Sequence, residues 1–523
     1  MSTIPIKSTV ITIISYLAFV CVGFAQKNDQ VSVTVSARQI GPDSLNKQSV
    51  PAVEYAFPER IHDFEVDTVN NFLTLDLRGV SKNGKWLDNK GDVVRFSTAE
   101  NRVLWTKRVF FQSGSIEQYG GTTLQTIGGK TYSLDNYSGE KLWEVQNSLL
   151  FVDRRLNTAI GYKLKRSNET LEGISLKDGQ TLWERKVRQD LGWNDLAYVN
   201  DTTLLIAAAG LHSVNLKTGK GWDYEATTGK KDRTGSAVGT GLGLAAGVLT
   251  GMYSVTTGYD LIKNICSNML RDSLGIYFAS KTELVKLRED GQQIWKTALS
   301  EDESSKSAIL IHKGSLVMIN WGYAERGQQK INMGRPFIAS FNLSNGETRF
   351  KTIVSNDKES ILDFALLDDE IAFVFDKRLE KYSLKDGRLL TTKAYNTAEV
   401  GELRYFLGDR VFVKSDKGFA SLKASDPQKL YVYTASAKTL ILDRSLNIVE
   451  KISIEDPFLV RIKTRDISVL SKRTECAVIN KNGELLLTLP ATSKVAFLRN
   501  KLYATNENRL LEIDLKNLLL TGN

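Results

Sequence analysis

Leu134-Asp-Asn-Tyr-Ser-Gly139, with Trp143 four residues later, is the segment that indicates the fold of this chain most directly. An alternating apolar run ends in leucine, a short polar turn ends in glycine, and an aromatic residue follows. The phrase returns twice in clear form, as Leu176-Lys-Asp-Gly179 with Trp183 and as Leu287-Arg-Glu-Asp-Gly291 with Trp295. Because recurrence at about 40 residues indicates an array of small supersecondary units, the chain is predicted to be a repeat protein.

The aromatic residues after these turns are regularly spaced. Intervals of 38, 40 and 39 residues separate Trp105, Trp143, Trp183 and Trp222. Trp295 follows after 73 residues, which is one unit plus an insertion of about 35 residues. Phe350 continues the series, three fainter turns come after it, and a last strand over residues 510–515 has no outer partner after it.

The turns explain why such units must stack. Asp-Gly and Asn-Gly pairs supply the positive φ angles of tight hairpins between twisted strands. A four-stranded unit of this length cannot bury both faces alone, so copies must pack on one another, and a radial stack is a propeller. We predict an all-β fold, a single propeller of four-stranded blades over residues 65–515. Eight blades are preferred, with seven, nine or ten as alternatives, and the arm at residues 26–64 is a candidate source of a closing strand.

Ser133 to Trp143 resembles the motif of the pyrroloquinoline-quinone-like (PQQ-like) β-propeller repeat family, with Asp135, Ser138, Gly139 and Trp143 at the motif positions. In other repeats the turn is shorter and the Asp is lost. In that family the aromatic residue wedges between adjacent blades, so the resemblance implies interblade docking by Trp105, Trp143, Trp183, Trp222, Trp295 and Phe350. The family holds quinoprotein dehydrogenases and non-catalytic exported members, such as the scaffold lipoprotein of outer-membrane assembly. The resemblance therefore implies a fold and leaves the activity open.

One insertion, residues 228–262, interrupts the repeats. Glycine recurs every fourth residue from Gly235 to Gly251, and no charged residue occurs from Thr234 to Tyr259. A helix here would carry a glycine groove, and it would need outside packing because glycine is costly in helix interiors. We prefer a helix or loop packed on the propeller. A docking element and membrane insertion are the less favoured alternatives, and a dinucleotide fingerprint is discounted because no βαβ unit surrounds it.

Residues 1–25 are predicted to be a cleaved signal peptide. Lys7 precedes an apolar stretch from Val10 to Val22, and small residues precede the cleavage point after Ala25. The stretch is short for a membrane span. Lipidation of Cys21 is the less favoured alternative, since a bulky valine precedes it.

The remaining composition bounds the compartment and the partners. Cys266 and Cys476 form no disulfide framework, which suits a bacterial periplasm or cell exterior. The net charge of +9 comes from basic residues scattered among acidic ones, a pattern with a mild preference for anionic glycans or lipid surfaces. Nucleic-acid binding is not expected, because the sequence has no basic stripe and no known module.

The residues do not predict a reaction. The three histidines, His62, His212 and His312, lie in separate contexts, and neither zinc nor hydrolase motifs occur. If the chain were a quinoprotein dehydrogenase, the resemblance would imply a quinone stacked over a tryptophan, a calcium ion and an Asp that acts as a base. We can match no residues of this sequence to a motif for any of these three features. We predict no catalytic, cofactor-binding or metal-binding residues.

Two longer loops are candidate binding sites. One carries Lys85 and Trp86, and the other, from Trp321 to Arg335, carries Trp321, Tyr323 and Arg326. Loops on propeller faces are where function usually lies. We predict an exported, non-catalytic propeller that acts as a binding or scaffold module for protein partners in the bacterial cell envelope. A degenerate quinoprotein dehydrogenase or a glycan-active enzyme is the alternative.

Overall fold

The computed structural model describes residues 31–516 apart from internal gaps. The gaps are 43–48, 68, 83, 85, 164–169, 189–192, 209, 227–229, 232–260, 264, 327–328, 356–358, 408–410, 416–417, 422–427, 453–457, 473–474, 491–493 and 499. The predicted signal peptide and Cys21 lie outside the described residues.

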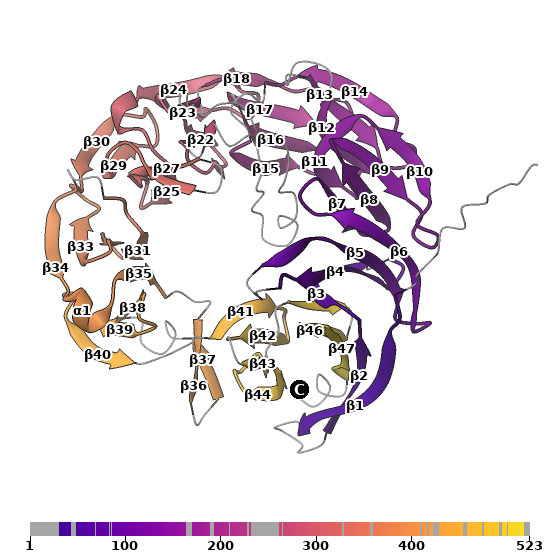
Figure 1. Cartoon of the computed structure of the whole chain (residues 1–523). Helices are drawn as coiled ribbons and strands as arrows, with labels where there is room; N and C mark the ends of the chain where they lie inside the picture. The colour runs from indigo at the N-terminus through magenta and orange to yellow at the C-terminus, as the bar shows by residue number, and fades with distance from the viewer. Residues whose placement is uncertain are drawn as a thin grey trace, which may run out of the picture.

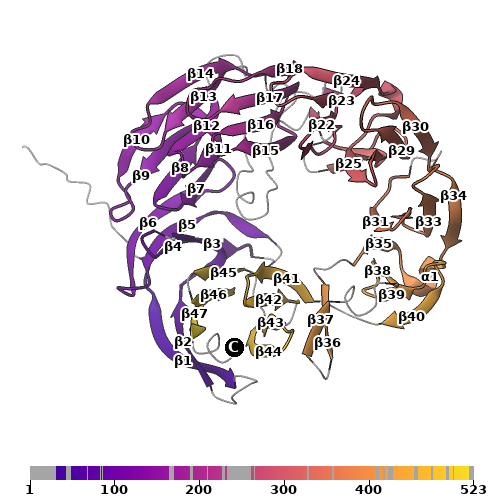
Figure 2. The same cartoon turned by 180° about the vertical axis from the view of Figure 1, so that it is seen from behind.

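The described strands form a ring of ten four-stranded antiparallel blades, seen from its two sides in Figure 1 and Figure 2. In each blade the first strand lies toward the centre of the ring and the fourth lies at the rim (Figure 1). The prediction of an all-β propeller is confirmed. The preferred count of eight blades is wrong, and ten was the upper alternative. The count failed because the last blades lack the tryptophan corner, and because the outermost strand of the tenth comes from the N-terminal part of the chain.

Blades 1 to 5 follow in chain order. Their strands are β3 (Arg60–Asp67), β4 (Phe72–Val80), β5 (Leu87–Ser97) and β6 (Arg102–Phe110); β7 (Gly114–Tyr119), β8 (Thr122–Ile127), β9 (Lys130–Leu134) and β10 (Lys141–Val145); β11 (Asn147–Asp153), β12 (Thr158–Lys163), β13 (Thr170–Ser175) and β14 (Thr181–Lys186); β15 (Asp195–Asn200), β16 (Thr203–Ala207), β17 (Gly210–Asn215) and β18 (Asp223–Glu225); β21 (Leu270–Asp272), β22 (Gly275–Ala279), β23 (Glu283–Leu287) and β24 (Gln293–Ala298).

Blades 6 to 10 complete the ring. Their strands are β25 (Ser307–His312), β26 (Ser315–Asn320), β29 (Phe337–Asn342) and β30 (Thr348–Ile353); β31 (Asp363–Leu367), β32 (Glu370–Val374), β33 (Arg378–Ser383) and β34 (Leu389–Ala394); β35 (Leu403–Phe406), β38 (Leu430–Thr434), β39 (Thr439–Leu442) and β40 (Ile448–Ile452); β41 (Phe458–Lys463), β42 (Ile467–Ser471), β43 (Glu475–Asn480) and β44 (Leu485–Pro490); β45 (Val495–Leu498), β46 (Lys501–Asn506), β47 (Arg509–Asp514) and β2 (Ser49–Ala56).

Strand β2 closes the ring from the other end of the chain. It pairs antiparallel with β47, with Ala52 opposite Ile513 and Tyr55 opposite Leu510. A further strand, β1 (Thr34–Pro42), adds to the outer edge of β2. Without β2, the outer edge of β47 would expose a row of unpaired backbone groups.

An apolar cluster fills each interface between neighbouring blades, ten in all among the described residues. Between blades 10 and 1, for example, Tyr503 shares a cluster with Phe96, and between blades 9 and 10 Val478 shares one with Leu502. Each blade thus buries both faces against neighbours, which is why the units are stable only as a ring.

Four strands form an additional sheet beside the ring, here called the accessory sheet. They are β19 (Lys230–Lys231), β20 (Leu261–Lys263), β27 (Tyr323–Arg326) and β28 (Gln329–Asn332). The predicted loop after Trp321 is therefore largely a β-hairpin, inserted between β26 and β29 of blade 6. The insertion contributes the other two strands. Residues 235–251 lie outside the described residues, so their helical or loop form stays a prediction.

A second inserted hairpin bridges blades 8 and 9. Its strands, β36 (Val411–Ser415) and β37 (Gly418–Ser421), leave blade 8 between β35 and β38, and β36 pairs with β41 of blade 9. The helical segments that the structure describes are η1 (Glu301–Glu303) and α1 (Thr397–Val400). Within the described residues, none of the helices has the length and apolar character needed to cross a bilayer.

The antiparallel order gives the ring two distinct faces. Connections from the first to the second strand and from the third to the fourth lie at one end of each blade, and the other connections lie at the opposite end. The glycine corner turns lie on the first face, here called the corner face. The hairpin between β4 and β5, the β27–β28 hairpin and the insertion all lie on the second, here called the insertion face.

Candidate functional site

The aromatic residues of the predicted corners lie at the interfaces between blades. The indole N–H of Trp143 in blade 2 donates to the carbonyl oxygen of Leu176 in blade 3 at 3.2 Å. A Cβ added to Gly179 of that turn would lie 2.8 Å from Trp143 Cε3. The same contact recurs between consecutive blades at Trp105 and Gly139, Trp183 and Gly219, Trp222 and Gly291, Trp295 and Gly346, and Phe350 and Gly387.

These contacts determine what the corner tryptophans can do. Each described indole N–H of the series is bonded to a backbone carbonyl of the next blade. The glycines have φ angles near +70 to +84°, which residues with a side chain rarely adopt. Glycine is therefore required both by the backbone of the turn and by the aromatic ring that packs against it. These six aromatic rings therefore pack between neighbouring blades.

The first candidate loop is a tight hairpin tip between β4 and β5. Trp86 is 72% exposed, and its backbone is held by Ser81, whose N–H donates to the Trp86 carbonyl at 2.8 Å while its Oγ accepts from the Trp86 N–H at 3.1 Å. Lys85 lies outside the described residues.

The second candidate site is the hairpin of the accessory sheet. The Nζ of Lys330 lies 3.7 Å from the centroid of the Tyr323 ring, and the Nζ of Lys306 lies 5.6 Å from it. Trp321 meets Tyr323 edge to face with ring centroids 6.2 Å apart. Partial desolvation, followed by the charge of Lys306, lowers the pKa of Lys330. Arg326 lies on β27 opposite Ile262 of the insertion, so two features that are separate in the sequence share one sheet.

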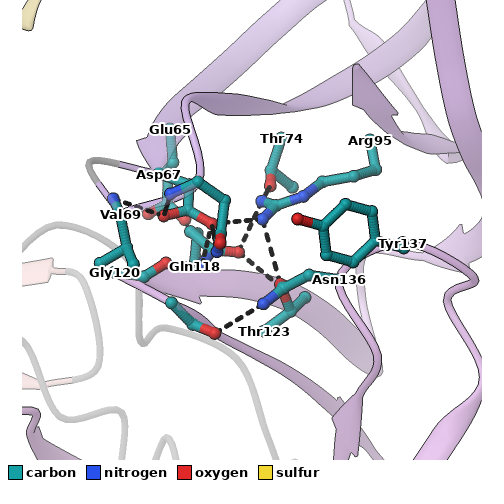
Figure 3. A network of polar contacts seen from close by, with 12 residues as sticks. Glu65, Asp67, Val69, Thr74, Arg95, Gln118, Gly120, Thr123, Asn136 and Tyr137 are labelled. Carbon is teal, nitrogen blue, oxygen red and sulfur yellow. Dashed lines mark hydrogen bonds and ion pairs between the residues drawn. The ribbon is translucent and has the colours of Figure 1, made fainter. Parts of the chain in front are cut away.

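A buried polar network between blades 1 and 2 has no clear signal in the sequence (Figure 3). The guanidinium of Arg95 and the carboxylate of Asp67 are both fully buried and form an ion pair of 2.5 Å. Arg95 also donates to Thr74 and Gln118 at 2.7 Å each and to Asn136 at 3.0 Å. Gln118 and Asn136 belong to blade 2, so one arginine joins the two blades through charge-assisted hydrogen bonds.

Half-buried carboxyl groups lie near this network on the inner strands. Burial raises the pKa of Glu65 to about 7, although its carboxylate accepts the backbone N–H of Gln118 at 2.5 Å. Burial, reinforced by the charges of Asp63 and Glu65, raises the pKa of Asp76 to about 8. Asp63 itself pairs with Lys494 of blade 10. The carboxyl groups of Glu65 and Asp76 can therefore hold protons near neutral pH.

His212 links blades 3 and 4. Its Nδ1 lies 2.6 Å from Asp223 Oδ1, and the same oxygen accepts from Arg185 of the preceding blade at 2.6 Å. The imidazole ring is buried, and its Nε2 has no hydrogen-bond partner. Among the residues that the structure describes, no group of three or more His, Cys, Asp or Glu side chains is arranged to hold a metal ion.

A comparison with protein family models matches one part of the chain. Residues 80–249 match the family model described as outer membrane protein assembly factor BamB. The predicted resemblance to the PQQ-like repeat family is confirmed over this part of the chain, which covers most of blades 1 to 4 and part of the insertion. No curated protein matches the chain.

Three solved structures are among those similar to the chain. BamB from Moraxella catarrhalis aligns with a TM-score of 0.33 and 13% identity, covering 78% of this chain and 96% of its own. The computationally designed Ika8 protein aligns with a TM-score of 0.32 and 11% identity, covering 72% and 99%. KlHsv2 with loop 6CD replaced by a Gly-Ser linker aligns with a TM-score of 0.28 and 9% identity, covering 66% and 98%.

Proposed function

We propose that this protein is an exported, non-catalytic scaffold of the bacterial cell envelope that binds protein partners through the accessory sheet on its insertion face. The match of residues 80–249 to a family named for an outer membrane protein assembly factor supports a role in envelope protein assembly. The commitment of the corner aromatics to interblade packing supports a ring that serves as a rigid platform.

The observation that carries the proposal is the accessory sheet itself. Two inserted segments more than 60 residues apart in the chain pair with each other at Ile262 and Arg326 and add nothing to the closure of the ring. The surface that they build combines Trp321 and Tyr323 with Lys330 beside the tyrosine ring. Aromatic and cationic side chains with apolar bodies are enriched at protein interfaces and among their energetically dominant residues.

Co-purification from envelope extracts tests this role. The variant Tyr323→Ala is compared with the wild-type chain and with Tyr405→Ala, a matched removal of an exposed tyrosine on blade 8. We expect Tyr323→Ala, and deletion of residues 235–251, to lose co-purified envelope proteins that Tyr405→Ala retains. Equal recovery from all variants would reject the accessory sheet as the binding surface.

The enzymatic alternative makes a different demand on the same preparation. A quinoprotein would show the absorbance of a bound quinone, or calcium-dependent dye reduction after reconstitution. Either result would replace the scaffold proposal with an enzyme.

A further inference from the structure

Blade 1 extends beyond its neighbours on the insertion face. Strands β4 and β5 have 9 and 11 residues, whereas their equivalents have 6 and 5 in blade 2 (β8 and β9) and 6 each in blade 10 (β46 and β47). At about 3.3 Å per residue, the additional length corresponds to roughly 10–20 Å of strand. The hairpin therefore carries its tip, with Trp86, away from the body of the ring.

Apolar side chains are exposed at this tip and along the adjoining end of blade 2. Trp86 is 72% exposed, Phe110 53%, Ile127 47% and Val80 41%. The ends of the two blades are joined, because the N–H of Ser113 donates to the Phe110 carbonyl at 3.0 Å and the N–H of Gly128 donates to the Ser113 carbonyl at 3.2 Å. We call the four apolar residues, together with the exposed Lys82 and Lys90, the blade 1 tip.

The charge around the blade 1 tip is positive. Five basic residues, Arg78, Lys82, Lys90, Lys107 and Arg108, stand against Asp88 and Asp92 in the described parts of residues 78–92 and 106–112. One pair is internally compensated, since Arg108 binds Asp92 at 2.9 Å. Lys90 lies with its Nζ 4.7 Å from the centroid of the Phe110 ring, so its charge sits beside an exposed apolar side chain.

We propose that the blade 1 tip docks onto an anionic phospholipid surface. Tryptophan prefers the boundary between headgroups and acyl chains, where its ring is buried and its N–H stays hydrated. Lysines beside it reach anionic headgroups while their stems cover apolar surface. Four apolar side chains are far fewer than the roughly 20–30 residues per side of a stable protein interface, so a membrane surface is the better fit. The proposal does not depend on the accessory sheet, which the proposed protein binding uses.

Vesicle flotation tests the proposal with the purified protein and two kinds of vesicle, phosphatidylglycerol mixed with phosphatidylethanolamine, and phosphatidylcholine alone. We expect binding to the anionic vesicles that weakens with added salt. Trp86→Ala should lower the affinity by about tenfold or more, in line with the loss of a buried aromatic side chain. Lys82→Gln with Lys90→Gln should lower it by about 25-fold, since each lysine near an anionic surface contributes about fivefold. Trp86→Phe should retain part of the binding.

Matched controls come from the corner face. Leu274 is 65% exposed in a turn on that face, so Leu274→Ala removes a comparable apolar side chain. Lys177→Gln with Lys385→Gln removes two exposed lysines from corner turns. Both controls should bind vesicles like the wild-type chain, and all variants should unfold at the wild-type urea midpoint. In wild-type protein, brominated lipids should quench a fluorescence component that Trp86→Ala lacks.

Three results would overturn the proposal. The first is equal vesicle binding by the Trp86 and lysine variants and the corner-face controls. The second is equal binding to neutral and anionic vesicles. The third is loss of a co-purified envelope protein in Trp86→Ala with unchanged vesicle binding, which would assign the blade 1 tip to a protein partner instead.

Discussion

Leu446 occupies the corner of blade 8 where blades 2 to 7 have glycine, and Thr391 occupies the position in blade 7 where the preceding blades have the aromatic residue. Leu446 has a φ of 65°, is fully buried and belongs to the apolar cluster between blades 7 and 8. Thr391 pairs with Lys381 as Trp295 pairs with Lys286 two blades earlier. The large and small side chains have exchanged sides of the interface, because close packing requires that the volume be filled and not that a given residue fill it.

Truncating this leucine should weaken the interface. Leu446→Gly is expected to lower the free energy of unfolding by about 1–3 kcal/mol, because the cavity costs more than the relief of the positive φ returns. Adding Thr391→Trp to Leu446→Gly should recover part of the loss by restoring the arrangement of the earlier blades. Urea unfolding followed by fluorescence measures both effects. If Leu446→Gly alone is as stable as the wild-type protein, Leu446 does not fill the interface.

The glycine corners should resist any side chain. Gly179→Ala places a Cβ 2.8 Å from the ring of Trp143 at a φ of +74°, so both overpacking and backbone strain apply. We expect a loss of about 2–4 kcal/mol in unfolding free energy. Gly128→Ala is the matched control, since its φ is +56° but nothing lies within 4 Å of its added Cβ. Gly128→Ala should lower the free energy of unfolding only by the backbone strain, about 1 kcal/mol. A similar loss at both sites would argue against the contact with the Trp143 ring.

The buried ion pair of blades 1 and 2 should be costly to break from one side. Arg95→Met leaves the fully buried carboxylate of Asp67 without its guanidinium, and we expect a loss of about 3–5 kcal/mol in unfolding free energy. Arg102→Gln removes an exposed ion pair with Glu100 and should cost less than about 1 kcal/mol. If the two variants have equal midpoints in urea unfolding, the network does not join the blades energetically.

The carboxyl groups of Glu65 and Asp76 predict a pH dependence of stability. Their pKa values rise from 4.5 and 3.8 to about 7 and about 8 in the folded protein. At pH values between the unfolded and the folded pKa of each group, the folded state holds a proton that the unfolded chain has released. The free energy of unfolding should therefore fall as the pH rises, and it should level off above about pH 8. Each unit of raised pKa corresponds to about 1.4 kcal/mol.

Asp76→Asn should isolate one of these groups. The variant should show a shallower fall in unfolding free energy between about pH 5 and pH 8.5, and it should gain stability relative to wild type at the upper end. Parallel pH profiles for variant and wild type would contradict the raised pKa of Asp76. An exposed carboxyl group replaced in the same way, Asp201→Asn, should leave the profile unchanged.

The sequence alone determined the repeat and the chemistry of its corners. Turn residues such as Asp178-Gly179 and the aromatic residue after them act within a few residues of each other, so their pattern is visible without a fold. The sequence also predicted an arm, an insertion and two candidate loops outside the repeats. It did not determine the blade number, because in blade 8 the glycine is replaced by Leu446, and at blade 9 the turn at Gly483 meets Phe419 of an inserted hairpin instead of an aromatic corner.

The pairing of segments that lie far apart in the sequence is visible only in the folded protein. The pairing of Ile262 with Arg326 turns an insertion and a loop into one sheet, and the pairing of Ala52 with Ile513 closes the ring. The ion pair of Arg95 and Asp67 depends on two strands and on hydrogen bonds from a second blade. Such contacts form because strand edges and buried charges need hydrogen-bond or charge partners. Those partners come from segments that are distant in the sequence, so the local sequence does not identify them.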